Sequence, residues 1–209
     1  LIGLVGSEMC IRDRLYLEEK DFVSGLSALR QAVTFFPNNV ETRVVSKRMI
    51  NEFSSIYTDG TADSMTPLTA LSMYDQFREL TPVGRRGDRI IQRLADRLVE
   101  VDLLDRAAVL LDRQVKFRLR GKQKAMVGSK LALIRLLDRQ PRLALDALNV
   151  SVSPGLDSRL ALERKRLRSR SVFELGDSES ALKLIKNDDS RKADLLRADI
   201  YWRTQDWER

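Results

Sequence analysis

The 209-residue sequence contains no histidine and a single cysteine, Cys10. A disulfide within the chain is therefore impossible, and a zinc site built from Cys and His is excluded. The commonest general base near neutral pH is also missing. The sequence shows no GxSxG, no Gly-rich phosphate loop and no HExxH motif. We therefore expect a chain that is not an enzyme and that holds no metal and no cofactor.

Long apolar runs are absent as well. The longest extend over about five residues, as from Ala107 to Leu111, whereas a transmembrane helix needs about 20. We expect no membrane span in this sequence. Localisation stays open, because a chain with no Cys after residue 10 suits the cytoplasm and a bacterial periplasm equally.

Aromatic residues make up only 6 % of the chain, and runs of alternating β-branched residues are lacking, so strands have little support. Hydrophobic residues reach 43 %, enough for a substantial core. Leu, Ala, Arg and Asp are abundant, and straight-chain residues and Ala lose little conformational freedom in a helix. The composition predicts an all-α fold.

The formal net charge is +7, from 37 basic and 30 acidic residues. A basic excess raises nucleic acid or an anionic membrane as a partner. The two signs are interspersed along the expected helices, as on a solvated surface, and no basic stripe with aromatics is evident. Nucleic-acid binding is therefore the less favoured interpretation.

Small residues occur in pairs that are 12 positions apart. The pairs are Ala95 and Ala107, Ala132 and Ala144, and Ser169 and Ala181. The second members recur every 37 residues. Two antiparallel helices approach closely only where side chains are small, and the spacing across the turn is set by the helix length and the loop. The pattern predicts a series of helical hairpins.

Apolar residues and turn signals agree with these hairpins. Apolar side chains around each pair recur with helical period. Pro141 suits the first turn of a helix and Gly176 the left-handed residue that ends one. The stretch 40–81 fits the repeat poorly but still predicts two helices, with Thr66 and Pro67 as the cap and first residue of the second.

Two segments identify the family that this sequence resembles. The stretch from Lys20 to Asn39, which ends in Pro-Asn-Asn, looks like the second helix and terminal proline of a tetratricopeptide repeat. The stretch from Ala198 to Trp207 looks like the first helix of another copy. The repeats here run 37 residues rather than about 34, and Ala or Ser stands where the family typically has Gly.

The resemblance implies an α-solenoid of stacked antiparallel helical hairpins over residues 15–209. The expected hairpins cover residues 15–39, 40–81, 88–118, 123–150, 157–187 and, truncated, 191–209. Residues 1–14, which include VGSEMCIRDR, resemble translated sequencing-adapter sequence. We expect this segment to be foreign and the chain to be an internal fragment of a longer protein.

Tetratricopeptide repeats bind partner peptides in a concave groove that is lined by the first helix of each hairpin. Transferred to this sequence, the groove positions are Gln92, Asp96, Ser129, Leu133, Arg166, Arg170 and Asp199. They flank the small sites and point away from the second helices. The groove as a whole and ordinary solvation or packing are equally consistent with the sequence, but for any single residue ordinary solvation or packing is the favoured interpretation.

Two further features bear on binding. The densest positive run, from Arg164 to Arg170, suits an acidic segment or a carboxylate, or else forms one exposed helix face. Trp202 and Trp207 are candidate contact residues, although packing within the last hairpin is the favoured interpretation.

The sequence thus favours a non-catalytic scaffold or adaptor that binds a peptide or protein surface in the groove. An alternative is a helical sensor or assembly arm of a larger regulator or envelope-associated enzyme. Nucleic-acid binding through the basic surface is a lesser alternative.

Overall fold

The computed structural model describes residues 15, 16, 18–35 and 40–205. The secondary structure of these residues consists of α-helices and two short 3-10 helices, with no strand among them. The all-α fold of antiparallel helical hairpins is therefore confirmed. The segment with adapter-like sequence and the Pro-Asn-Asn motif lie outside the described residues, and so does Trp207.

The chain divides into two compact units between Leu94 and Ala95. The first unit contains α2 (Phe22–Phe35), α3 (Val40–Thr58), α4 (Pro67–Gln76) and the beginning of α5 (Arg85–Glu100). Helices α2 and α3 pack against each other as a hairpin.

An aromatic cluster joins α3 to α4. The rings of Phe53 and Tyr57 lie 5.0 Å apart, and Tyr74 meets Tyr57 edge-on at 6.2 Å. The Tyr57 hydroxyl donates a hydrogen bond of 2.8 Å to the Ala70 carbonyl oxygen, which satisfies a buried polar group. The predicted cap of α4 is confirmed, because the Thr66 side chain accepts a hydrogen bond from the Thr69 N–H.

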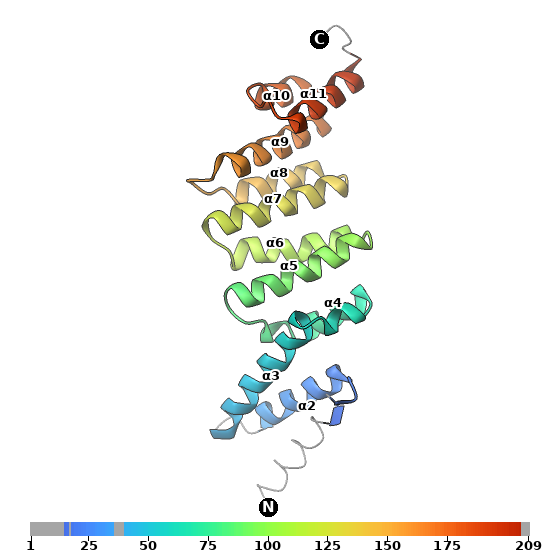
Figure 1. The fold of residues 1–209 in the computed structure, drawn as a ribbon, viewed down its shortest axis with the longest axis vertical. Coiled ribbons are helices and arrows are strands. Elements are labelled where there is room, and N and C mark those ends of the chain that lie inside the picture. Colours follow the sequence, from blue (N-terminus) through green and yellow to red (C-terminus); the bar gives the residue numbers. More distant parts are fainter. Residues whose placement is uncertain (1–14, 17, 36–39, 206–209) are drawn as a thin grey trace, which may run out of the picture. The chain divides into compact units, whose positions relative to one another are not determined.

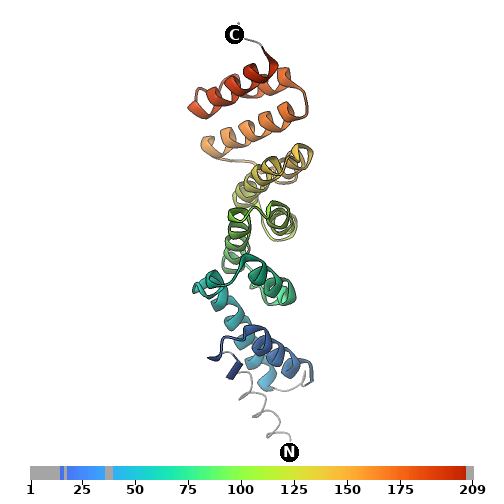
Figure 2. The ribbon, with the colours of Figure 1, turned by 90° about the vertical axis from the view of Figure 1, so that its right-hand side faces the viewer.

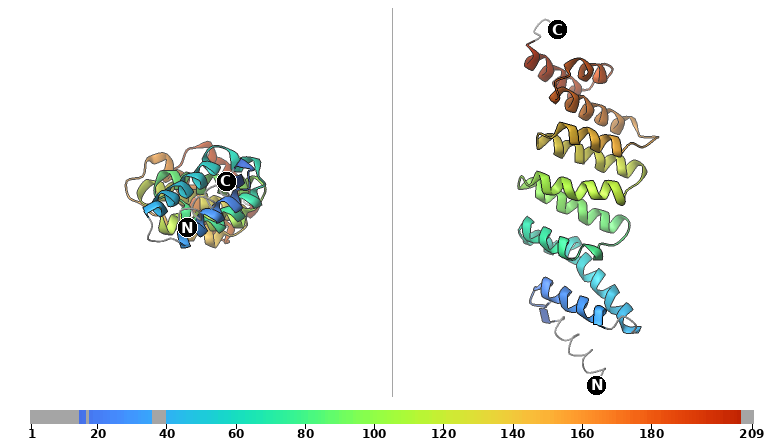
Figure 3. Two further views of the ribbon diagram at one scale, coloured as in Figure 1. Left: turned by 90° about the horizontal axis from the view of Figure 1, so that it is seen from below. Right: turned by 180° about the vertical axis from the view of Figure 1, so that it is seen from behind.

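The second unit continues with six helices, which stack along the chain in Figure 1. They are α6 (Leu104–Phe117), α7 (Gly121–Leu137), α8 (Pro141–Val150), α9 (Ser158–Glu174), α10 (Ser178–Ile185) and α11 (Arg191–Thr204). Helix α7 packs against α6 and α8, and α9 packs against α7, α8 and α10. Figure 3 (right) shows the same stack from behind, and Figure 2 shows α9, α10 and α11 side by side.

All six residues of the small pairs are fully buried. Two of the pairs, in α7–α8 and α9–α10, lie on helices that contact each other. The closest approach in the second hairpin involves a residue that the repeat did not indicate. A Cβ added to Gly128 on α7 would lie 2.0 Å from the Ser151 Oγ at the end of α8.

The turn that ends each first helix also repeats. Asp102, Arg139 and Gly176 have left-handed backbones, with φ angles of 61°, 55° and 97°, and they are 37 residues apart in sequence. After each one, the next N–H bonds the carbonyl five residues back, at 2.8, 2.7 and 3.2 Å. This is the Schellman arrangement, which prefers glycine at the left-handed position. Only Gly176 has the preferred residue type, so the left-handed geometry of the other two turns had no local signal in the sequence.

The last helix differs from the sequence-based expectation. Packing of Trp202 within the last hairpin is the favoured interpretation of the sequence, but Trp202 is 68 % exposed, and Ala198 on the same helix is exposed as well. Helix α11 instead packs on α9 and α10 through Ala193, Leu196 and Ile200. These residues lie on the opposite side of the helix from Ala198 and Trp202.

Candidate functional site

A cavity of about 530 Å³ lies in the second unit against α7, α9 and α11. It is lined by Leu133, Leu136, Leu137, Glu163, Arg166, Leu167, Arg170, Lys192, Leu195 and Leu196. We call this the leucine groove. Its volume falls within the range of about 300–1,000 Å³ that is usual for ligand sites.

Each of the three helices contributes one face to the leucine groove. Helix α7 supplies positions 133, 136 and 137, α9 supplies 163, 166, 167 and 170, and α11 supplies 192, 195 and 196. These spacings of three and four residues place side chains on the same side of a helix. The α7 and α11 sets have the same internal spacing, and α9 repeats it with one further position, Arg170.

Several of the groove leucines are exposed to solvent. Leu133, Leu137 and Leu195 are 47 %, 56 % and 63 % exposed. A single exposed leucine needs no explanation, but leucines that converge on a cavity from separate helices form an apolar patch of the kind that contacts partners. The lining of the groove therefore combines six leucines with four charged residues.

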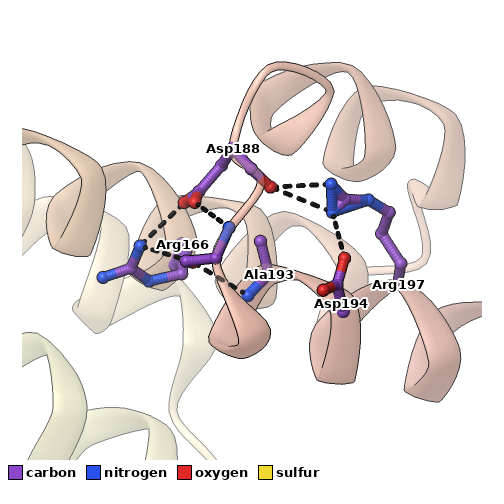
Figure 4. A network of polar contacts seen from close by, with 6 residues as sticks. Arg166, Asp188, Ala193, Asp194 and Arg197 are labelled. Atoms are coloured by element: carbon purple, nitrogen blue, oxygen red, sulfur yellow. Dashed lines mark hydrogen bonds and ion pairs between the residues drawn. The ribbon is translucent and has the colours of Figure 1, made fainter.

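Arg166, one of the charged residues of the groove, is held by an internal ion pair. Its Nη1 lies 2.7 Å from the Asp188 Oδ2 and 3.3 Å from the Ser190 Oγ. Asp188 is almost fully buried and also accepts a hydrogen bond from the Ser190 N–H. Both nitrogens at the tip of Arg197 donate to the Asp188 carbonyl oxygen, at 3.1 and 2.7 Å. Figure 4 shows this network, which fixes the turn between α10 and α11 against α9.

Two effects act on the pKa of Asp188. Burial alone raises the pKa of this carboxyl group, but the hydrogen bonds from Ser190 and Arg166 more than offset that effect. The net result is a pKa below the ordinary value, so the Asp188 carboxylate is charged at neutral pH. The charge of Arg166 is thus neutralised within the protein.

Arg170 also has acidic neighbours. Its side chain lies 3.4 Å from Asp199 of α11 and 3.5 Å from Glu174. Glu174 is further paired with Arg203 at 2.8 Å, and this hydrogen bond holds the pKa of the Glu174 carboxyl group below its usual range. By contrast, Glu163 and Lys192 are exposed and form no ion pair with any residue that the structure describes. These two charges are available to a partner.

Three of the residues proposed from the sequence line the leucine groove, namely Leu133, Arg166 and Arg170. Asp199 lies next to them as the ion-pair partner of Arg170. The four residues come from three different helices, so the structure brings part of the predicted set together.

The other three do not join this site. Ser129 is only 2 % exposed, because its hydroxyl donates to the Ala125 carbonyl oxygen at 3.0 Å and accepts from Arg164. It therefore cannot contact a partner on the surface, which corrects the sequence-based proposal. Asp96 pairs with Lys130 and does not line the groove. Gln92 is partly exposed and belongs to the first unit.

Sequence reasoning missed the remaining groove residues, most of which are leucines. Their spacing of three and four residues was present in the sequence. It did not distinguish them from core residues, because leucines in a helical stripe more often pack inside.

The positive run of α9 is dispersed around the helix. Arg164 points inward to backbone carbonyls of α7 and α8 at 2.7 and 2.6 Å. Arg166 and Arg170 pair with carboxylates, whereas Arg168 donates to Asn149 at 2.7 Å. The run is therefore not a single cationic patch.

Comparisons with known proteins add little to this geometry. No family model and no curated protein matches the sequence. Among solved structures, the chain is similar to that titled "Crystal structure of MamA protein", with a TM-score of 0.43 and 16 % identity over 99 % of this chain and 97 % of that one. The described residues contain no cluster of three or more His, Cys, Asp or Glu side chains suited to a metal ion. None of the described helices is long and apolar enough to cross a membrane.

Proposed function

We propose that this chain is a non-catalytic protein-interaction scaffold and that the leucine groove of α7, α9 and α11 receives a peptide or a protein surface. The observation that carries the proposal is the convergence of six leucines from three helices on one cavity, with three of them about half exposed. Covering these side chains would remove apolar surface from water, which is the main favourable contribution to association.

The charges around the groove set limits on the partner. Arg166 forms an ion pair with Asp188, and Arg170 forms ion pairs with Glu174 and Asp199. We infer that the two arginines shape the walls of the groove and do not offer free charge to a partner. The unpaired charges, Lys192 and Glu163, have opposite signs. We infer that the partner contributes apolar anchors and that charge has a secondary, orienting role.

The same ion pairs argue against binding of nucleic acid at the leucine groove. Binding to phosphate needs guanidinium and ammonium groups that lie together and lack internal counter-ions. Both arginines that line this groove, Arg166 and Arg170, are paired with carboxylates. The structure supplies no specific observation in favour of a sensor or assembly arm.

The test is a selection of binding peptides with groove and control variants. Peptides would be selected from a random displayed library on the full chain, and their affinity would be measured for the variants Leu133→Lys, Leu195→Lys and Leu143→Lys. Leu143 is the matched control, because it is 45 % exposed but lies on α8 and does not line the groove.

We expect the two groove variants to weaken binding at least about tenfold and the Leu143 variant to leave it unchanged, since a buried leucine anchor contributes on the order of 1.5–3 kcal/mol. Peptides that bind all variants equally would place the binding surface elsewhere. A failure to select any peptide at micromolar affinity would also count against the proposal.

A further inference from the structure

A second cavity, of about 200 Å³, lies on the opposite face of α9 from the leucine groove. It is lined by Leu148, Val152, Ser153, Leu156, Ala161, Arg164, Lys165 and Arg168. We call this the loop cavity, because residues 151–157 connect α8 to α9 along it. The two cavities share no lining residue.

The lining of the loop cavity contains three cations and no carboxylate. Arg164 is held only by neutral acceptors: the Ala125 and Leu148 carbonyl oxygens and the hydroxyls of Ser129 and Ser151. These acceptors fix the guanidinium group but do not neutralise it.

The other two cations also lack a counter-ion. Arg168 donates to the amide oxygen of Asn149, a neutral group. Lys165 is exposed and has no ion pair among the described residues. Asp157, the carboxylate in the adjoining loop, forms an ion pair with Lys122 at 2.7 Å and accepts a hydrogen bond from the Leu160 N–H at 2.9 Å. The loop cavity therefore has an excess of positive charge.

This charge is partly removed from water. Burial lowers the pKa of Arg164, the nearby charge of Arg168 lowers it further, and the charge of Glu163 raises it. The net result is a pKa below the ordinary value, so the charged guanidinium is less stable here than in solution. A bound anion would offset the repulsion between the two arginines.

The rest of the loop cavity is aliphatic, and its size limits what it can hold. Leu148, Leu156 and Ala161 contribute to the wall, as does Val152, which is 68 % exposed. A volume of about 200 Å³ is below the range of about 300–1,000 Å³ that is typical of drug-sized ligands. The site therefore fits one small ligand that combines an anionic group with an apolar group.

We propose that the loop cavity binds an aliphatic carboxylate. The carboxylate lies between Arg168 and Lys165, beside the fixed guanidinium of Arg164, and a short branched alkyl group packs against Val152 and Leu156. Arginine suits the carboxylate because its planar donors match two carboxylate oxygens. The site is independent of the function proposed for the leucine groove.

The experiment is an NMR titration of the full chain, labelled with nitrogen-15, with four small probes. Isovalerate carries the branched alkyl group and the carboxylate as a free acid. N-acetyl-leucine carries them as the carboxyl-terminal residue of a peptide chain would. Isovaleramide has the same alkyl group without charge, and inorganic phosphate has charge without the alkyl group. We expect both carboxylates to give saturable shifts of the amide signals of residues 152–156 and both controls to bind at least about tenfold more weakly.

Variants locate the site. Arg168→Gln and Lys165→Gln are expected to weaken the binding of isovalerate roughly tenfold, because each removes a charge-assisted contact. Lys183→Gln is the matched control, since Lys183 is an exposed cation on α10 that pairs with Glu179. The groove variant Leu133→Lys should also leave the shifts unchanged, which separates this test from that of the leucine groove.

The outcomes are distinguishable. If N-acetyl-leucine binds more tightly than isovalerate, the ligand is a peptide chain end. If isovalerate binds more tightly than N-acetyl-leucine, the ligand is a free acid. Both results support the proposal. Equal shifts with isovaleramide, equal affinity for phosphate, or binding that survives both cation variants would overturn it. Folding of each variant is checked by its unchanged helical circular dichroism.

Discussion

The Ser169 hydroxyl donates a hydrogen bond of 2.7 Å to the Ala181 carbonyl oxygen, and neither residue is exposed to solvent. The two residues are 12 positions apart, on helices α9 and α10 that pack against each other. In this hairpin, their contact is the structural basis of the 12-residue spacing between small residues. A small residue is needed there for space, and this one also satisfies a hydrogen bond.

Substitutions at Ser169 should separate these two roles. Ser169→Ala removes only the hydrogen bond and is expected to lower the free energy of unfolding by about 1 kcal/mol. Ser169→Leu also forces a large side chain between α9 and α10 and is expected to cost about 3 kcal/mol or more. Urea unfolding followed by circular dichroism measures both. The same changes at Ser158, which is exposed at the start of α9, should cost under about 0.5 kcal/mol; equal losses at the two sites would contradict the contact.

The left-handed turns predict a gain in stability. Arg139 is exposed and adopts a φ of 55°, a conformation that costs a non-glycine residue about 1 kcal/mol. Arg139→Gly is therefore expected to stabilise the second unit by about 0.5–1 kcal/mol, although glycine has more freedom in the unfolded chain.

Gly176 supplies the reverse experiment. Its φ of 97° is unfavourable for any side chain, so Gly176→Ala should destabilise by about 1 kcal/mol. If thermal unfolding shows that Arg139→Gly stabilises the protein and Gly176→Ala destabilises it, the repeated left-handed turn is supported. Destabilisation by both would show that the Arg139 turn is not left-handed in solution.

The sequence predicted the hairpin stack because small-residue spacing and helical periodicity repeat over three copies. It placed short turns between the paired helices, at Val101-Asp102 among others, but it did not predict the left-handed geometry of Asp102, since a Schellman turn without glycine leaves no local signal of that geometry. It placed Ser129 in the groove because spacing fixes which face of a helix a residue lies on. Spacing does not show whether another side chain, here that of Arg164, covers that face.

The close approach at Gly128 predicts a substitution effect of unusual sign. Replacing glycine by alanine inside a helix ordinarily stabilises it by roughly 0.8–1 kcal/mol. At Gly128 the new methyl group would lie 2.0 Å from the Ser151 Oγ, so we expect Gly128→Ala to destabilise by about 2 kcal/mol. The double variant Gly128→Ala with Ser151→Gly removes the obstructing side chain. It should lose less stability than the two single losses added together, and strict additivity would argue against the contact.

Arg164 and Lys165 are adjacent cations with different roles, and this makes them a matched pair. Arg164 bonds carbonyl oxygens of α7 and α8, whereas Lys165 is exposed. Arg164→Met should lower the free energy of unfolding by about 2–4 kcal/mol, because buried acceptors lose their donor. Lys165→Met should change it by less than about 0.5 kcal/mol. If urea unfolding gives similar free energies of unfolding for the two variants, the Arg164 side chain does not hold α7 and α8 together.

The ion pair between Asp188 and Arg166 predicts how stability depends on pH. The folded protein holds the pKa of Asp188 below its ordinary value of 3.8. A carboxyl group with a depressed pKa stabilises the fold above its unfolded pKa, and this contribution is lost as the pH falls through the lower, folded pKa. Asp188→Asn is therefore expected to cost about 1–2 kcal/mol at pH 7.

Below about pH 4 the wild-type protein should progressively lose this advantage, so its free energy of unfolding should approach that of the variant. Urea unfolding of both proteins between pH 7 and pH 3 measures the difference. Asp146→Asn, an exposed change on α8, serves as the control and should leave the wild-type pH profile unchanged. A difference between wild type and Asp188→Asn that stays constant across this range would mean that the carboxylate charge does not stabilise the turn between α10 and α11.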